Sequence, residues 1–252
     1  MMKTFSLPFG KGTQTVSLDE AHVLYDLHGN PVDAVADEQE AIRQALRHPI
    51  GSAPLKDVVQ AGDTVAIIVS DITRLVYTAQ MLPVIVDELN QAGVRDEQIT
   101  VVTAQGTHRA HRPEEDVIVC GEDMVKRVKV VSHDCRDASQ LTKIGTTTHG
   151  NDVYLDSHVV QADKVILTGA VSFHPMAGFG GGRKAVLPGV ASYETIMRNH
   201  AMALTDTFGG GCNPRCETSL LEDNPLHDDM KQAAALLNPC FLVNTVFSAD
   251  GD

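Results

Sequence analysis

The chain has 252 residues, enough for one large domain or two small ones with a substantial buried core. Its formal net charge of −13 argues against nucleic-acid binding, because phosphate recognition requires clustered lysine and arginine. There is no apolar run long enough to cross a bilayer, no signal-peptide core and no framework spacing among the cysteines, so we expect a cytoplasmic protein without membrane partners.

The first part of the chain predicts a strand pair followed by short helices. Residues Phe5 to Leu27 alternate apolar and polar around a Gly-Lys-Gly turn, which is typical of two antiparallel strands. Asp37 to His48 has the apolar spacing of a helix and ends before Pro49. Leu55 to Ala61 predicts a short helical or turn segment.

From residue 64 onward the pattern becomes that of an α/β protein. Thr64 to Ser70, Ile99 to Ala104 and Lys164 to Ala170 are near-continuous apolar runs, as expected of parallel strands covered on both faces. The segments around them predict helices over Thr78 to Ala92 and Glu114 to Arg127, and strands over Val128 to Ser132 and Val153 to Leu155. This alternation implies βαβ crossovers in a doubly wound, mostly parallel, Rossmann-like sheet.

Polar side chains follow three of these strands at their carboxyl ends, where ligands bind in such sheets. Asp71, Thr73 and Arg74 follow the first strand, His108 the second and His174 the third. Asp71 and Arg74 could form an ion pair, but an arginine here also suits bidentate binding of a carboxylate. The two histidines could be a surface residue and a semi-buried residue, or a paired acid and base across a cleft.

A run of glycines from Gly178 to Gly182 leads from the third strand end to Arg183 and Lys184. Its spacing matches neither a Walker A loop nor a dinucleotide fingerprint. A plain flexible loop is one interpretation, but a glycine-rich loop at a strand end favours ligand binding. Lys184 could then act as a cation or as a nucleophile.

A predicted helix with a further histidine follows this run. Ser192 caps the helix, which extends to about Met202, and His200 shares one of its faces with Ile196. That face could bury His200 in the core, or it could direct the imidazole towards Lys184 as a metal ligand. The spacing leaves both possibilities open.

Two later motifs favour structural roles. Cys212 and Cys216 form a tight pair without further cysteine or histidine ligands beside it, which favours loop thiols over a zinc site. Asn224 and Pro225 begin a predicted helix, in whose first turn His227 is expected to be structural. Residues 241–247, FLVNTVF, predict a final strand.

These motifs resemble those of the nickel-dependent lactate racemase family. The resemblance rests on DITR from Asp71, GTHR from Gly106, GFGGGRK ending at Lys184 and YETIMRNH ending at His200. The motifs occur in the family's order, and the match spans roughly Thr64 to Met230. It implies that residues 1–252 form a cofactor-binding N-terminal domain.

The resemblance implies a nickel pincer nucleotide, a pyridinium mononucleotide with two thiocarboxyl-derived arms around nickel. Lys184 would carry it covalently and His200 would be the protein ligand to nickel. Asp71, Thr73 and Arg74 would lie against the cofactor, and Arg74 also against the substrate carboxylate. Dedicated proteins synthesise such a cofactor, so we expect them as partners and expect a recombinant chain to lack it.

The implied reaction is racemisation or epimerisation of a 2-hydroxy acid, with His108 and His174 as the acid/base pair. One histidine removes the hydroxyl proton while hydride leaves C2 for the cofactor, which gives a planar 2-keto acid. Hydride then returns to the other face, and the opposite histidine reprotonates the oxygen. The cofactor carries the hydride, while the protein supplies orientation and proton transfer.

The sequence departs from the family in two respects. Leu75-Val76 replaces the proline that often follows the DxTR motif. The substrate therefore need not be lactate itself, and we expect a lactate-like or larger 2-hydroxy acid. Family members also carry a second, substrate-binding domain, so we expect this chain to be the N-terminal part of a longer protein. The alternatives are a non-catalytic module that binds a small molecule or nucleotide, and a mononucleotide-dependent enzyme without nickel.

Overall fold

The structure is a computed structural model that describes residues 1–30, 32–205, 207 and 209–247. It divides into two units. The smaller comprises Met1–Ala34 with Phe247–Asp252, and the larger comprises Val35–Val246. All the strand ends named above belong to the larger unit.

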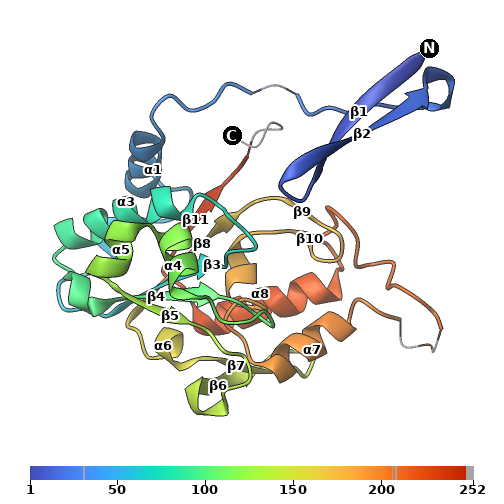
Figure 1. The fold of residues 1–252 in the computed structure, drawn as a ribbon. Helices are drawn as coiled ribbons and strands as arrows, with labels where there is room; N and C mark the ends of the chain where they lie inside the picture. Colours follow the sequence, from blue (N-terminus) through green and yellow to red (C-terminus); the bar gives the residue numbers. More distant parts are fainter. Residues whose placement is uncertain (31, 206, 208, 248–252) are drawn as a thin grey trace. The chain divides into compact units, whose positions relative to one another are not determined.

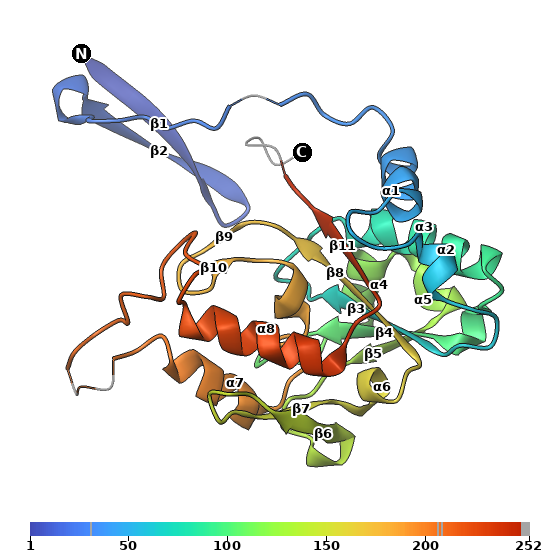
Figure 2. The same cartoon turned by 180° about the vertical axis from the view of Figure 1, so that it is seen from behind.

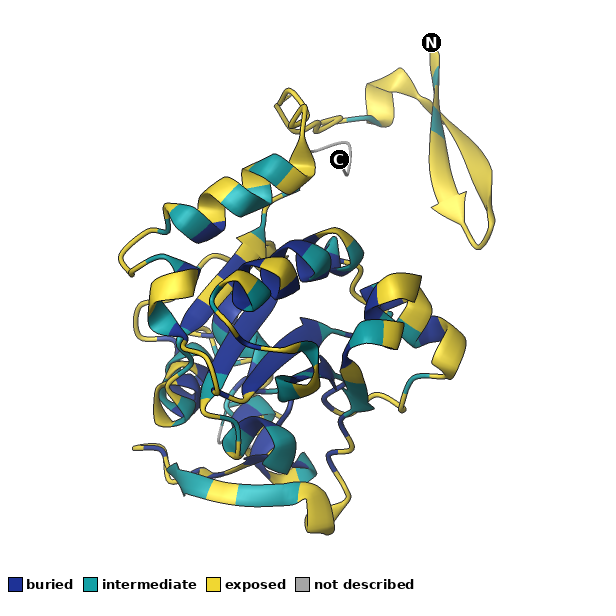
Figure 3. Ribbon diagram, turned by 90° about the vertical axis from the view of Figure 1, so that its left-hand side faces the viewer, coloured by how far each residue is buried: buried dark blue, intermediate teal, exposed yellow. Residues whose placement is uncertain are grey.

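The smaller unit is built on the predicted strand pair. β1 (Met2–Phe9) and β2 (Gly12–Asp19) are antiparallel and pair along their full lengths. Gly10, with φ of 59°, makes the tight turn between them in a conformation that favours glycine. The second strand is shorter than predicted, because the 3-10 helix η1 (Glu20–His22) follows it directly. Figure 3 shows both strands as largely exposed.

The larger unit is organised around a five-stranded parallel sheet with the order β11–β8–β3–β4–β5 (Figure 1). Its strands are β3 (Val65–Ser70), β4 (Ile99–Ala104), β5 (Lys129–Ser132), β8 (Lys164–Ala170) and β11 (Phe241–Thr245). All four pairings are parallel, which confirms the predicted fold class. Because β3 lies between β8 and β4, the three strand ends singled out in the sequence are neighbours at the centre of the sheet.

Helices cover both faces of this sheet (Figures 1 and 2). One layer contains α1 (Glu38–Arg47), α2 (Leu55–Val58), α3 (Thr78–Gln91), α4 (Pro113–Cys120) and α5 (Glu122–Arg127). The other contains α6 (Ser157–Val160), α7 (Tyr193–Ala201) and α8 (Pro225–Leu237). Among the described residues, none of the helices is long and apolar enough to cross a membrane.

Two local predictions differ from the structure. The single helix predicted over Glu114–Arg127 is two helices, because Gly121 adopts φ of 91° and breaks it. The strand predicted at Val153–Leu155 is β7 (Asp152–Asp156), which lies outside the main sheet. It pairs antiparallel with β6 (Leu141–Thr146), a strand that the sequence pattern did not indicate.

The predicted starts of the two later helices are confirmed. The Ser192 side chain accepts a hydrogen bond from the Thr195 N–H at the start of α7. The Asn224 side chain likewise accepts from the His227 N–H, and Pro225 occupies the first turn of α8. The predicted final strand is β11, which forms one edge of the sheet.

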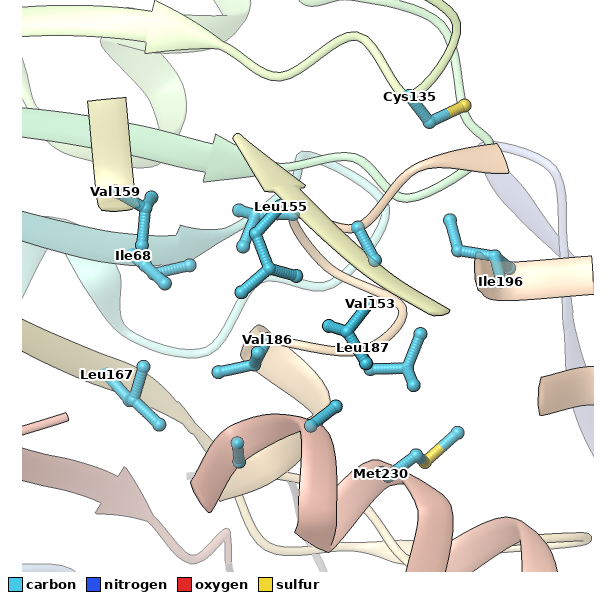
Figure 4. Close-up of a cluster of buried hydrophobic side chains, with 14 of the residues drawn as sticks. Ile68, Cys135, Val153, Leu155, Val159, Leu167, Val186, Leu187, Ile196 and Met230 are labelled. Carbon is cyan, nitrogen blue, oxygen red and sulfur yellow. The ribbon is translucent and has the colours of Figure 1, made fainter. Parts of the chain in front are cut away.

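The core on the α6–α8 side of the sheet anchors the segment after the glycine run (Figure 4). Val186 and Leu187, which directly follow the 3-10 helix η4 (Gly182–Ala185), are completely buried in a core cluster that also contains Ile68 and Leu167 of the sheet. Burial of each such side chain contributes about 1.5–3 kcal/mol. Lys184, within η4, is therefore fixed by the core next to it.

Candidate active site

Asp71 and His108 form a dyad between the ends of β3 and β4. His108 Nδ1 donates to Asp71 Oδ2 at 2.6 Å, and Thr73 Oγ1 donates to Asp71 Oδ1 at 2.8 Å. The Asp71 side chain is 3% exposed, whereas that of His108 is 48% exposed. Because Asp71 engages Nδ1, the Nε2 atom of His108 remains for acid/base work. The open alternative of an Asp71–Arg74 ion pair is thus not realised.

Arg74 lies on the same turn with its charge uncompensated. Its backbone N–H donates to the Asp71 carbonyl at 2.9 Å, which closes the turn. Within the described part of the chain, its guanidinium has neither an ion pair nor a side-chain hydrogen bond, and the residue is exposed. It is therefore available to an external carboxylate or phosphate.

His111 supports this turn, a role that the sequence did not reveal. Its Nε2 accepts a hydrogen bond from the Ile72 backbone N–H at 2.9 Å, and its Nδ1 donates to Asp116 at 2.9 Å. The His111 side chain is 1% exposed. The only signal for this role in the sequence was Asp116, five residues after His111 in the first turn of a predicted helix.

The glycine run packs tightly onto the end of β8 and is not a flexible loop. Gly181 has φ of 71°, and a Cβ there would lie 2.8 Å from the Ala170 carbonyl oxygen. Gly180 donates its N–H to the Ser172 carbonyl at 2.7 Å. Asn244, at the end of β11, accepts a hydrogen bond from the Gly182 N–H at 3.3 Å. Glycine is therefore required by close backbone packing.

Lys184 presents a partly buried amine without a hydrogen-bond partner in the described residues. Burial, followed by the charges of Arg74 and Arg183, lowers its pKa to about 8. An amine with this pKa is neutral, and so nucleophilic, in a far larger fraction at neutral pH than an ordinary lysine. An anion would also be attracted to these three cations.

His174 lies in the same field of positive charge. Burial, followed by the charges of Lys184 and Arg74, lowers its pKa to about 4. Its Nδ1 accepts hydrogen bonds from the Met176 N–H at 3.2 Å and the Ala177 N–H at 3.0 Å. The ring is therefore neutral near pH 7.

His200 lies close enough to this group for the charge of Lys184, after burial, to lower its pKa. The imidazole is therefore directed towards Lys184, while its role as a metal ligand stays a prediction. His200 Nδ1 donates to the Ile196 carbonyl at 3.0 Å, so Nε2 carries the free lone pair. An imidazole in this state can ligate a metal through Nε2.

No group of three or more potential metal ligands occurs among the described residues. A metal beside His200 would therefore need most of its ligands from a bound group. Cys212 and Cys216 are free thiols, exposed and buried respectively. The His227 side chain does not cap α8, and its buried Nδ1 has no hydrogen-bond partner among the described residues.

Comparison with known proteins places this chain in a family. The family model described as "Lactate racemase N-terminal domain" matches residues 9–209. The chain belongs to the lactate racemase family. The resemblance inferred from the motifs is thereby confirmed.

Two lactate racemases match nearly the whole chain. That of Lactiplantibacillus plantarum is 34% identical over 255 residues, which covers 99% of this chain and 58% of that protein. That of Thermoanaerobacterium thermosaccharolyticum is 31% identical over 250 residues, which covers 98% and 57% respectively. The chain thus spans 57–58% of the length of these lactate racemases.

Solved structures agree with the fold. The structure of the lactate racemase apoprotein from Thermoanaerobacterium thermosaccharolyticum matches with a TM-score of 0.85 at 31% identity. That match covers 99% of this chain and 57% of the other. A protein from Thermotoga maritima matches with a TM-score of 0.65 at 20% identity, which shows a shared fold.

In this member of the lactate racemase family, two sets of predicted residues occupy the same end of the sheet. Asp71, Thr73 and His108 form one hydrogen-bonded set. The other set shares one electrostatic environment and consists of Arg74, His174, Lys184 and His200. The turn that carries Asp71 also carries Arg74, and it joins the two sets.

Proposed function

We propose that the chain is the cofactor-binding domain of a racemase or epimerase of 2-hydroxy acids. The family supports this proposal, because its named members are lactate racemases. The observation that carries it is the unpartnered amine of Lys184, with a pKa of about 8, beside the imidazole of His200. An amine of this kind suits covalent attachment of a group that also engages a metal.

The residues present fit a nickel pincer nucleotide. The amine of Lys184 suits a bond to a thiocarboxyl group, and the Nε2 lone pair of His200 suits nickel. The guanidinium groups of Arg74 and Arg183 add positive charge for the anionic parts of a nucleotide. When bound, this cofactor would supply a hydride acceptor for C2 of the substrate, which amino-acid side chains lack.

The chain's own residues would bind the substrate and move its hydroxyl proton. The free guanidinium of Arg74 would hold the carboxylate in bidentate fashion. His108 would accept the hydroxyl proton at Nε2, while Asp71 stabilises the resulting imidazolium through Nδ1. His174 would contact the same oxygen from the opposite face of the substrate.

The substrate is proposed to be lactate-like or larger. Leu75 follows Arg74 directly and is 60% exposed, which leaves an apolar side chain beside the carboxylate-binding group. Such a side chain favours a substrate with an apolar substituent on C2. We further propose that the protein acts in the cytoplasm and receives its cofactor from dedicated synthesis proteins.

The test is intact-mass and peptide mass spectrometry of the protein after co-expression with cofactor-synthesis proteins. We expect a mass increment on Lys184 together with bound nickel, and conversion or C2 hydrogen exchange of a 2-hydroxy acid. Activity should be measured on the whole polypeptide that carries residues 1–252, since its relatives are longer. Absence of both the adduct and any C2 exchange would refute the proposal.

Two variants make this test specific. Lys184→Met should abolish the adduct, whereas Lys126→Met should retain it, because Lys126 forms only a surface pair with Glu122 on α5. His200→Ala should retain the amide-type bond to Lys184 but lose nickel. If the wild-type protein carries the adduct but contains no nickel and shows no turnover, the chain would instead be a nucleotide-binding module.

A further inference from the structure

Helix α8 contains a buried acid, Asp229, that is not one of the candidate site residues. Its side chain is completely buried, and among the described residues it has no ion-pair partner. Its two oxygens instead accept hydrogen bonds from three neutral side chains: Thr147 Oγ1 at 2.6 Å, Asn151 Nδ2 at 2.9 Å and Asn199 Nδ2 at 2.9 Å. We call these four residues the Asp229 cluster. Because all three neighbours donate, the acid is satisfied as a carboxylate.

The Asp229 cluster joins α8, α7 and the loop 147–151 between β6 and β7, which lie side by side (Figures 1 and 2). Asn199, on α7, also donates to the Leu226 carbonyl of α8 at 3.1 Å. Asn151, in the loop, also donates to the Thr195 carbonyl of α7 at 3.1 Å. Helix α7 is therefore held at two residues, Thr195 and Asn199, which are four apart and lie on one face.

The Asp229 cluster adds direction to the packing of α7. Apolar side chains would fill this space at less cost, because a buried charge loses its hydration. Apolar contacts such as those of Ile196, on the same helix, resist separation but have no preferred direction. Hydrogen bonds, in contrast, weaken steeply when their angles change. The cluster therefore fixes the rotation of α7 about its own axis more sharply than packing alone.

That rotation directs the imidazole of His200, the residue after Asn199. His200 Nδ1 donates to the Ile196 carbonyl of the same helix, so the ring moves together with α7. A side-chain tip lies roughly 6 Å from a helix axis, so a rotation of about 20° would displace Nε2 by about 2 Å. Metal–ligand distances must be held within about 0.2 Å. A small error in the rotation of α7 is therefore enough to separate His200 from a metal.

We propose that Asp229 is a positioning residue for nickel binding: its carboxylate fixes the rotation of α7 and thereby directs His200 Nε2. This inference rests on the proposed function, in which His200 is the protein ligand to nickel. Asp229 is completely buried and acts on the metal only through α7. Lys184 lies on η4, outside the Asp229 cluster. Loss of the carboxylate should therefore weaken nickel retention and leave the bond to Lys184 intact.

The main test compares Asp229→Asn with Glu88→Gln in protein loaded by co-expression with the cofactor-synthesis proteins. Asparagine keeps the shape of the side chain but turns an N–H group towards donors of the cluster. Glu88 is a matched buried acid, 2% exposed, which pairs with Arg47 in the other helical layer. We measure nickel per Lys184 adduct and the rate of nickel loss to a chelator. Asp229→Asn should lose nickel about 10–100-fold faster, as when a group that orients a metal ligand is removed, and Glu88→Gln at the wild-type rate.

A milder pair of variants tests the same cluster from the loop. Thr147→Val removes the hydroxyl that donates to Asp229 at 2.6 Å, whereas Thr147→Ser keeps it. Neither variant alters α7, α8 or η4. We expect Thr147→Val to lose nickel about 10-fold faster, the lower end of the same range, and Thr147→Ser to match the wild type. If Asp229→Asn does not fold, this pair decides the test.

A spectroscopic measurement needs no cofactor. In unloaded protein labelled with nitrogen-15 histidine, the ring signals of His200 are assigned by their loss in His200→Gln. They should shift in Asp229→Asn and Thr147→Val, and stay in place in Glu88→Gln and Thr147→Ser. Unchanged ring signals in both of the first two variants would contradict the proposed rotation.

The remaining outcomes separate the possible failures. If Asp229→Asn and Thr147→Val retain nickel as the wild type does, or if Glu88→Gln loses it equally fast, the carboxylate only stabilises the fold and the positioning role is wrong. Loss of the Lys184 adduct in Asp229→Asn would also overturn it, because the cluster would then hold the whole site. A wild-type protein that acquires neither adduct nor nickel would refute the proposed function and this role together.

Discussion

Lys184 shows how one side chain acquires reactivity from its surroundings. Burial removes water from the ammonium group, and Arg74 and Arg183 place like charges near it. All three influences disfavour the protonated amine, and the described residues include no carboxylate that pairs with it. The backbone around Lys184 is fixed by the buried Val186 and Leu187, so the amine cannot easily withdraw to solvent.

We therefore expect Lys184 to react with an acylating reagent with an apparent pKa of about 8. Its labelling rate should level off above that pH, while the other lysines continue to accelerate. Competitive labelling across pH 6–11, read by peptide mass spectrometry, measures this rate. In Arg74→Leu the apparent pKa should rise, since one like charge is removed. A wild-type Lys184 that titrates as an ordinary lysine would contradict the expectation.

At this scale, the sequence predicted which residues gather but not how they pair. The strand-end rule identified Asp71, His108 and His174, because the carboxyl ends of neighbouring parallel strands lie together. It could not show that Asp71 binds His108 rather than Arg74. Pairing depends on the direction of each side chain, and spacing along the chain does not contain that direction.

Among the elements, the end of β11 holds two parts of the site. Asn244 Oδ1 accepts a hydrogen bond from the Gly182 N–H. The same oxygen lies so close to Gly169 and Gly181 that a Cβ added to either would be 3.2 Å or 3.0 Å from it, respectively. Thr245 Oγ1 donates to the Val76 and Gly169 carbonyls at 3.3 and 3.4 Å. The edge strand therefore positions the glycine run and the segment after Arg74.

Replacing Asn244 with leucine should loosen the glycine run. The buried Gly182 N–H would lose its acceptor, which costs about 1–3 kcal/mol. We expect a lower unfolding free energy in urea and faster amide exchange over residues 178–185. Asn244→Asp keeps an acceptor at the same place and should exchange as the wild type does. Equal protection in Asn244→Leu would show that the contact does not hold the run.

A second inter-element contact involves β7, β5 and α7. Asp156, at the end of β7, accepts hydrogen bonds from His133 Nδ1 and His158 Nδ1, each at 3.0 Å. His133 also contacts the Ala191 carbonyl at 2.9 Å through Nε2, just before α7. Burial raises the pKa of Asp156, but the hydrogen bonds from the two histidines together lower it below its ordinary value.

This lowered pKa predicts the pH dependence of stability. A carboxyl with a depressed folded-state pKa stabilises the protein above its unfolded pKa of about 4, and the contribution disappears as pH falls through the folded value. Asp156→Asn should therefore lower the unfolding free energy by about 3–5 kcal/mol at pH 7, with the difference shrinking below pH 4. Urea denaturation at several pH values measures it.

The matched control for that variant is Asp152→Asn, an exposed acid on the same strand that pairs with Lys143 at the surface. It should change stability by less than about 1 kcal/mol. If the effect of Asp156→Asn stays constant down to the acid limit of folding, the buried carboxylate does not contribute through its charge.

The elements themselves were predicted well where apolar runs are long, and poorly where they are short. The three central strands β3, β4 and β8 are buried on both faces, so continuous apolar runs rich in Val and Ile marked them. Strand β6 is only partly buried and mixes polar with apolar residues, which gave no periodic signal. Gly121 breaks a helix that its neighbours' periodicity had suggested, because glycine tolerates φ of 91°.

At the scale of the whole chain, the hydrophobic core is confined to one unit. Among the described residues, every buried hydrophobic side chain lies between Leu46 and Val243. Deletion of Met1–Ala34 should therefore leave the main thermal unfolding transition within a few degrees of its original midpoint. Circular dichroism and calorimetry of the truncated chain measure it. Loss of the cooperative transition would show that the core depends on the strand pair.

Deletion of residues from 241 onward is the opposite control. It removes β11, whose Phe241 and Val243 are buried, and exposes the edge of β8. The midpoint should fall substantially, because two large apolar side chains and a row of backbone hydrogen bonds are lost. The two deletions together locate the cooperative unit.

The charge distribution also has meaning at this scale. The protein carries a formal net charge of −13, yet Arg74, Arg183 and Lys184 lie within reach of one another at a single strand-end site. The positive potential at this site attracts small anions, whereas the negative charge of the rest of the protein repels them. Composition alone predicted the acidic surface, whereas the cationic site required the fold.

Strand β11 comes from the last part of the sequence described, yet it pairs with β8, which carries the glycine run. During synthesis, the run leaves the ribosome well before Asn244 does. Until then it lacks the side chain that accepts from Gly182, and the edge of β8 is unpaired. The glycine run before Lys184 therefore gains this contact only when β11 has paired with β8.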